Sequence, residues 1–177
     1  MSRRTRSRAT TLFAIALVRC NHAPIQAAIP ARAPMIDTLN DVARFVIREP
    51  LTAEDVIHQF GAIITDHGRG GSLELASTDP RFTRVQLWRD VGSGAPYLLE
   101  LELAPTARVN VTEVSAAFGV AADVTPSALE SQPALLFYDI AKGTAFDVSL
   151  IVLTDASREL VTTVVFRRDI HLPPEPS

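Results

Sequence analysis

The densest group of reactive side chains in the sequence is the run Asp66-His67-Gly68-Arg69-Gly70-Gly71. It combines a carboxylate, an imidazole and a guanidinium with flexible glycine backbone. Arg69 and the backbone N–H groups of such a turn could bind a carboxylate or a phosphate. An enzyme could use Asp66, His67 and Arg69 together with His58. The run does not begin a helix, however, and it lacks the lysine and the spacing of a phosphate-binding loop. We therefore expect a hairpin connection here, with a small-molecule or anion site as the alternative.

No other catalytic or metal-binding pattern can be assembled from the sequence. The histidines lack the short His-x-His or His-x-x-x-His spacings of metal sites. Cys20 is the only cysteine, so the chain can form neither an internal disulfide nor a cysteine-based metal site. We find no Ser–His–acid arrangement, paired-carboxylate motif or nucleotide fingerprint. We predict a protein that is not an enzyme and that uses no cofactor and no metal.

A different kind of candidate comes from the alternating pattern of the extended segments. Between residues 72 and 103 one side of the expected strands is apolar, and the other side would carry Glu74, Arg84, Gln86, Trp88, Glu100 and Glu102. Opposite charges on this side can pair, so a solvated face is the simplest explanation. Trp88 is the exception, because large aromatic rings often anchor binding surfaces. Trp88 and Arg84 are our candidate binding residues, and packing of Trp88 under a loop is the alternative.

The later extended segments, within residues 134–168, are apolar on both sides. Ile151 and Leu153 alternate with Leu150 and Val152 along one of them. Strands of this kind are normally covered on both faces. We expect the second side to be covered by helices, by the other half of the chain or by a partner, which makes it a candidate interface for another protein or for self-association.

Two short segments match each other without a gap and indicate an internal repeat. Each begins with a helix-capping residue, places an acid three residues later and ends in glycine. In residues 51–61 and 109–119 the matched positions are Thr52 and Asn110, Asp55 and Glu113, and Gly61 and Gly119. We predict a short helix in each segment. A coincidental match is the alternative, because any short capped helix shares these features.

Three extended segments follow each predicted helix. They are residues 72–77, 82–90 and 96–103 in the first set and residues 134–140, 146–154 and 160–168 in the second. The connections are too short for crossover helices, so consecutive strands should pair antiparallel. We predict an α+β fold in which a tandem αβββ repeat forms an antiparallel sheet of about six strands, with helices packed on one face. The two sets could form one sheet or two sheets joined edge to edge.

The expected domain covers residues 35–171, with repeats at 51–105 and 109–169, because one repeat alone is too small to bury a stable core. Another helix precedes the first repeat. Its apolar residues have helical spacing and either of two polar residues could cap it: Ile36, Leu39, Val42 and Val46, capped by Asp37 or Thr38. The proline-rich end, residues 172–177, should fray.

Residues 1–34 differ in composition from the rest of the chain. They contain six arginines and no acid, and the basic start followed by apolar Ala9–Val18 has the layout of an export signal. Translation that begins at Met35 is the alternative that we prefer slightly, and it would favour the cytoplasm. An organelle transit peptide is a third possibility. The apolar stretch is too short to cross a bilayer, so we expect no integral membrane segment.

Charge narrows the range of partners. The 17 basic residues include the six N-terminal arginines, so the other residues hold 11 basic against 20 acidic side chains, a net charge of −9. This surplus of acid disfavours nucleic-acid binding. The partner is then another protein or a second copy of the chain.

The capped helices also carry a family resemblance. Thr52–Gly61 and Asn110–Gly119, each leading into antiparallel strands, look like the half-units of the SmpA/OmlA lipoproteins and of the tandem-repeat β-lactamase inhibitory proteins. The resemblance implies a non-enzymatic sheet that presents a concave surface to another protein. The chain departs from it in having three predicted strands per repeat instead of four and no disulfide, and no binding residue can be transferred. We therefore favour a non-catalytic protein-interaction or structural module of unknown partner.

Overall fold

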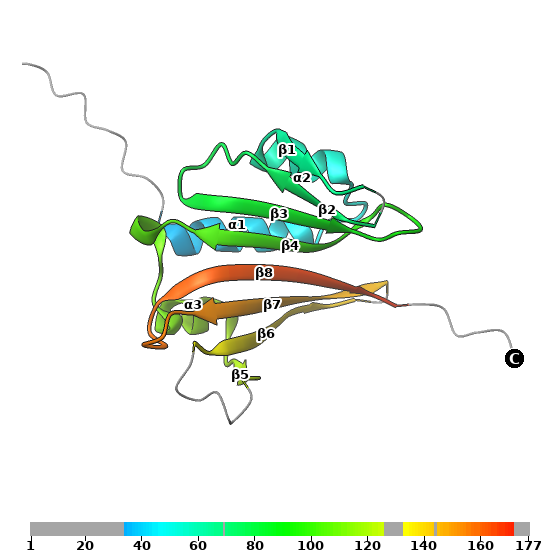
Figure 1. Ribbon diagram of the computed structural model, residues 1–177. Helices are drawn as coiled ribbons and strands as arrows, with labels where there is room; N and C mark the ends of the chain where they lie inside the picture. Colours follow the sequence, from blue (N-terminus) through cyan, green and yellow to red (C-terminus); the bar gives the residue numbers. More distant parts are fainter. Residues whose placement is uncertain (1–33, 69, 126–132, 144, 172–177) are drawn as a thin grey trace, which may run out of the picture. The chain divides into compact units, whose positions relative to one another are not determined.

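The computed structural model describes residues 34–68, 70–125, 133–143 and 145–171. Within these ranges the chain forms one antiparallel sheet of eight strands with three α-helices (Figure 1). The predicted extension before Met35, apart from Pro34, and the predicted tail at residues 172–177 lie outside the described residues, as does Arg69.

The chain contains two sets of four strands, each preceded by a helix, and a further helix comes before the first set. The helices are α1 (Met35–Val46), α2 (Ala53–Phe60) and α3 (Val111–Phe118), with a short 3-10 helix at Pro105–Ala107. The strands are β1 (Ile63–Asp66), β2 (Ser72–Leu75), β3 (Phe82–Arg89), β4 (Pro96–Leu103), β5 (Ala122–Asp123), β6 (Leu135–Lys142), β7 (Phe146–Thr154) and β8 (Val161–Ile170). Thus α2 leads into β1–β4, and α3 leads into β5–β8.

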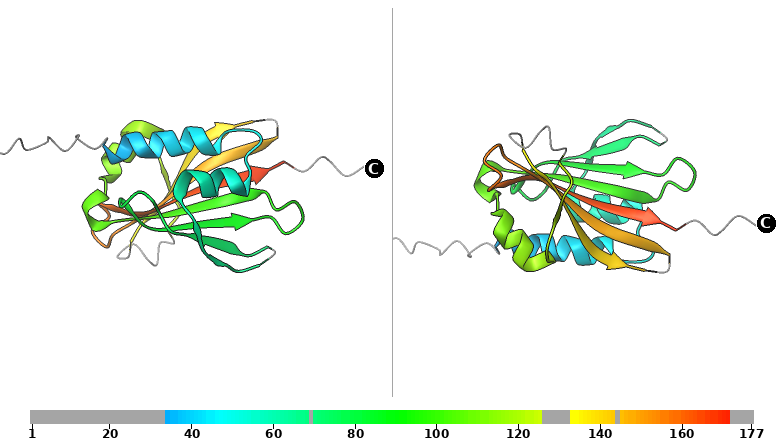
Figure 2. Two further views of the ribbon diagram at one scale, coloured as in Figure 1. Left: turned by 90° about the horizontal axis from the view of Figure 1, so that it is seen from above. Right: turned by 90° about the horizontal axis from the view of Figure 1, so that it is seen from below.

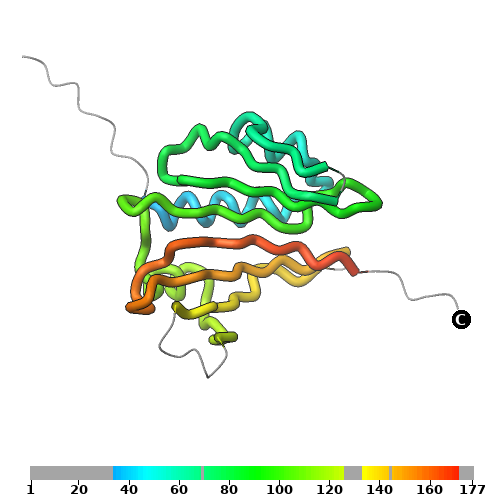
Figure 3. Tube along the Cα trace, in the orientation of Figure 1, coloured from blue at the N-terminus to red at the C-terminus, as the bar shows by residue number. Residues whose placement is uncertain are grey.

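The strand order is β1-β2-β3-β4-β8-β7-β6-β5, and every neighbouring pair is antiparallel. Within each set consecutive strands pair antiparallel, as predicted, and β4 pairs with β8 to join the two sets into a single sheet. In the trace of Figure 3 the green strand β4 and the red strand β8 run side by side, each as the inner strand of its set. Leu99 lies opposite Phe166 at this central pair, and Leu101 lies opposite Val164.

The prediction of about six strands was wrong, because β1 and β5 were missed. Both lie at the edges of the sheet, and they contain four and two residues. Their side chains are mostly exposed, so neither shows the alternation of apolar and polar residues that marks a half-buried strand.

All three helices lie on the same face of the sheet, behind the strands in Figure 1, and Figure 2 shows the same arrangement from above and from below. Helix α1 contacts β8 and α3, while α2 contacts β3 and α3 contacts β6. The core between the layers is apolar, and its largest fully buried side chains include Leu39, Val46, Val56, Leu73, Leu87, Leu101, Tyr138, Leu150 and Phe166. The hydroxyl of Ser115 on α3 lies 3.1 Å from that of Tyr138 on β6, and this hydrogen bond satisfies the buried phenol.

The predicted cap of α2 is present in full, whereas at α3 the Asn110 side chain accepts no cap hydrogen bond and only the Glu113 contact is formed. Thr52 and Asp55 form a capping box at α2, in which the Asp55 N–H donates to the Thr52 hydroxyl and the Thr52 N–H donates to the Asp55 carboxylate. At α3 the Glu113 carboxylate accepts from the Asn110 N–H at 2.8 Å. The predicted cap of the first helix was wrong: α1 begins at Met35 after Pro34, with no side-chain cap. Met35 is buried in the core, and this burial places the start of the helix earlier than its polar residues suggest.

Gly61 and Gly119 end α2 and α3 with similar backbones but in different surroundings. Their φ angles, +141° and +95°, are rarely adopted by residues with a side chain. A Cβ atom on Gly61 would lie 1.8 Å from the carbonyl oxygen of Ala76, whereas one on Gly119 would meet no atom within 4 Å.

This contrast predicts unequal effects of the same substitution. Gly119→Ala should lower the free energy of unfolding by about 1–3 kcal/mol through backbone strain alone. Gly61→Ala should lower it by clearly more, because the backbone at Ala76 must also move. Chemical denaturation of the two variants would measure the difference, and equal losses would contradict the clash at Gly61.

Candidate functional site

Asp66, the acid of the 66–71 run, stabilises the hairpin to which it belongs. The Asp66 carboxylate accepts a hydrogen bond from the Gly68 N–H at 2.8 Å and one from the Arg89 guanidinium at 2.7 Å. Arg89, on β3, also donates to the Gly68 carbonyl at 3.0 Å. These bonds tie the β1–β2 turn to the neighbouring strand, which is the role expected of a hairpin connection.

The other residues of the proposed anion site are not gathered around Asp66. His67 is exposed, and its N–H donates to the Ser72 carbonyl across the hairpin at 3.0 Å. His58 lies on the exposed side of α2, and no hydrogen bond links it to the loop among the described residues. Because Arg69 is not described, the only guanidinium placed against the loop is that of Arg89, which the sequence analysis did not select.

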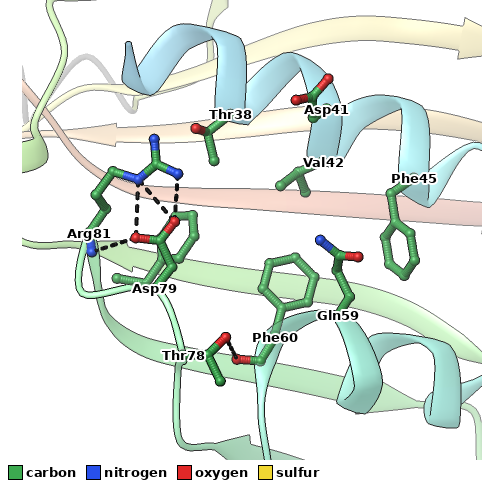
Figure 4. Close-up of a pocket in the computed structure, with 10 residues that line it drawn as sticks. Thr38, Asp41, Val42, Phe45, Gln59, Phe60, Thr78, Asp79 and Arg81 are labelled. Atoms are coloured by element: carbon green, nitrogen blue, oxygen red, sulfur yellow. Dashed lines mark hydrogen bonds and ion pairs between the residues drawn. The ribbon is translucent and has the colours of Figure 1, made fainter. Parts of the chain in front are cut away.

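A cavity of about 240 Å³ lies between α1 and α2 (Figure 4). Phe45 and Phe60 pack edge to face with centroids 6.1 Å apart, and Phe60 packs in the same way on Phe82 at 6.2 Å. At its border the Arg81 guanidinium contacts the Asp79 carboxylate at 2.6 Å. Ligand pockets for drug-sized molecules are usually about 300–1,000 Å³, so this cavity has room for no more than a small group.

The larger unoccupied surface is the sheet face opposite the helices, which we call the open face. The register places Trp88, Leu98, Arg167, Ser149 and Asp139 side by side across β3, β4, β8, β7 and β6. The next row runs from Glu74 through Gln86, Glu100, Val165 and Ile151 to Phe137. No helix in the described part of the chain lies on this face.

Apolar side chains gather on the open face of the second strand set and reach β3 through Leu98. We define the apolar patch as Trp88, Leu98, Phe137, Ile151, Leu153 and Val165. Leu153 is 38% exposed, Val165 is buried with 9% exposed, and the other four are half-buried. The patch confirms that β7 and β8 carry apolar residues on both sides, and their second side is left uncovered by the described elements.

The polar side chains of the open face are placed as expected, except that Gln86 is buried. Arg84 lies 3.8 Å from Glu74, as paired charges on neighbouring strands should. Gln86, expected in solvent, is only 6% exposed. Its side-chain amide donates to the Ser72 hydroxyl at 2.7 Å. That hydrogen bond allows burial of a group that sequence pattern alone assigns to solvent.

Two polar atoms on the open face are buried without a hydrogen-bond partner in the described structure. They are the indole nitrogen of Trp88 and the hydroxyl of Ser149. Ser149 is 4% exposed and sits between Arg167 and Asp139. Unpaired buried polar groups cost about 1–3 kcal/mol each, and natural proteins tolerate such costs chiefly at functional or strained sites. The sequence analysis selected Trp88 but gave no signal for Ser149.

No protein family, curated protein or solved structure matches the chain. Within the described residues no group of His, Cys, Asp and Glu is arranged to hold a metal ion. None of the helices described is long and apolar enough to span a membrane.

The hairpin contacts predict a pH-dependent role for Asp66. The Gly68 N–H, with help from Arg89, holds the pKa of Asp66 below its ordinary value of 3.8. A carboxyl group with a lowered pKa stabilises the fold above its ordinary pKa, and this contribution disappears as the pH falls through the folded-state pKa. Asp66→Asn should therefore lower the melting temperature at pH 7, and the difference from wild type should shrink below pH 3.8. A difference that stays constant with pH would contradict this role.

Proposed function

We propose that the protein is a non-catalytic interaction module that binds another protein through the open face of its sheet. The observation that carries the proposal is the asymmetry between the two faces. Three helices bury one face, whereas no described helix covers the apolar patch on the other face. Uncovered apolar surface bordered by polar residues is typical of interaction sites.

The composition of the open face supports protein binding over ligand binding. Binding energy at protein interfaces concentrates in Trp, Tyr and Arg side chains near the centre of the contact. Trp88 and Arg167 flank Leu98 in one row of the sheet, and charged residues surround the apolar patch. The small-molecule alternative has weaker support, because Asp66 is already engaged by Arg89 and Gly68.

We also propose that the two strand sets derive from one duplicated αββββ unit. In support, α2 with β1–β4 and α3 with β5–β8 have the same element order, and the strand order reads outward from β4 and β8 in the same way on both sides. Four strands per set also remove one departure from the SmpA/OmlA and β-lactamase inhibitory proteins, whose resemblance remains a prediction. The halves have diverged at their matched ends: Phe60 is buried, Phe118 is only half-buried, and the two glycines differ in surroundings.

The binding proposal predicts that changes on the open face separate binding from folding. Trp88→Ala and Ile151→Ser should each reduce recovery of the partner from native extract at least tenfold, as loss of an interface hot spot does. Each variant should keep the cooperative melting of the wild type, because neither side chain belongs to the core between sheet and helices. Quantitative affinity capture with mass spectrometry would measure the recovery.

A matched control lies elsewhere on the molecule. Val120 is 97% exposed, just after α3 and outside the open face. Val120→Ser should leave recovery unchanged. The proposal fails if the open-face variants and the control retain the same partners in the same amounts.

A further inference from the structure

We infer that the partner presents a basic protein segment, with lysine or arginine side chains beside apolar ones, to the centre of the open face. This inference rests on the proposed function and adds the chemistry of the partner. It follows from the arrangement of charges around the apolar patch.

Every basic side chain that the register places on the open face already has an acidic partner on that face. Arg84 pairs with Glu74 at 3.8 Å, Lys142 with Asp139 at 3.0 Å, and Arg167 with Asp169 at 2.6 Å. At one end of the face His171 lies 3.3 Å from Asp147. These pairs leave no described cation on this face to compensate further acids.

Two acids of the central strand β4 lie on this face without an ion pair. Glu100 and Glu102 form no ion pair within the described residues. They point to the same side of β4, because side chains two residues apart share a face. Glu100 lies between Val165 of the apolar patch on β8 and Gln86 on β3. Glu102 lies between Thr163 on β8 and Arg84 on β3, whose guanidinium pairs with Glu74. The middle of the sheet therefore presents one carboxylate directly beside Val165, and a second carboxylate shares the single cation Arg84 with Glu74.

Ser149 supplies an independent sign that this face receives a ligand. Its hydroxyl is buried and has no hydrogen-bond partner among the described residues. Ser149 lies on β7, two strands away from Glu100 on β4 and in the neighbouring row of the sheet. A hydroxyl can donate to a carbonyl or accept from an ammonium or guanidinium group. Both partners occur on a basic peptide segment.

Charge disfavours three competing occupants: a second copy that docks through its own open face, a nucleic acid and an anionic membrane. A second copy would bring its own Glu100 and Glu102 to a self-complementary contact, and the residues after position 34 already carry a net charge of −9. Nucleic acids and anionic membranes would be repelled for the same reason. A basic protein segment satisfies both the carboxylates and the apolar patch.

The test uses the full chain and two synthetic peptides of equal length that share the same leucines. One peptide carries arginine at the remaining positions, and the other carries glutamate. Trp88 is the only tryptophan in the chain and lies on the open face, so its fluorescence reports binding. The arginine peptide should shift the Trp88 emission, and its affinity should fall as salt is raised from low to physiological concentration. The glutamate peptide should give no shift.

Two isosteric double variants identify the charges responsible. Glu100→Gln with Glu102→Gln should weaken binding of the arginine peptide about tenfold, which corresponds to ~1.4 kcal/mol. Asp37→Asn with Glu54→Gln removes the same charge from exposed positions on the helix side and should leave the affinity unchanged. Thermal melting of both double variants verifies folding.

The outcomes separate this inference from the proposed function. Equal binding of both peptides, binding of neither, or equal weakening by the two double variants would overturn the basic partner. If Ile151→Ser abolishes peptide binding while the Glu100 and Glu102 variant does not, the open face remains a protein-binding surface and its charge selectivity is refuted. Concentration-dependent dimerisation that the Glu100 and Glu102 substitutions enhance would also overturn it, since the occupant would then be a second copy.

Discussion

The pairing of β4 with β8 is the contact on which the rest of the structure depends. Each strand set alone would have a narrow sheet and one short helix, with too little apolar surface to form a stable core. The β4–β8 ladder aligns Leu99 with Phe166 and Leu101 with Val164, all of them nearly or fully buried. It thereby gives α1 a continuous apolar surface to cover. The same ladder brings Glu100 beside Val165 on the opposite side, so the core and the open face are set by one register.

The two faces of the sheet differ in how they combine apolar and charged side chains. The helix side buries its apolar residues and leaves few polar groups among them. The open side combines apolar residues with ion pairs, which keep surface charge close to the apolar patch. Such pairs contribute little to stability when exposed, but they fix the positions of Arg84 and Arg167 and leave the β4 carboxylates without an ion pair in the described structure.

The sequence predicted the long elements well and the edges poorly. Alternation of apolar and acidic residues from Leu99 to Leu103 located β4, and the predicted bounds of β4 and β7 match the structure. The capping box at α2 was equally predictable, because it depends only on Thr52 and Asp55, which are three residues apart. In β1, Ile63 and Ile64 are adjacent and both exposed, so no alternation marks the strand.

The candidate site was predictable only in part. Trp88 was recognisable as a large ring among polar neighbours, and the apolar second side of β7 was visible in the sequence. The gathering of these residues on one face depends on which strands are neighbours, and that order arises from long-range pairing that local patterns do not encode. The burial of Gln86 and the isolation of Ser149 follow from the same pairing.

The central position of β8 also affects the rate at which the sheet folds. Residues 104–160 separate β4 from its partner strand β8. Pairing of the two strands therefore closes a long loop, and the loss of chain entropy on closure slows the formation of their hydrogen bonds. Until β8 docks, β4 exposes an unpaired backbone edge and the side chains of Leu99 and Leu101. A newly made chain therefore passes through a stage that is prone to aggregation and suited to capture by a chaperone. The contact that unites the mature sheet is thus also among the slowest for the polypeptide to acquire.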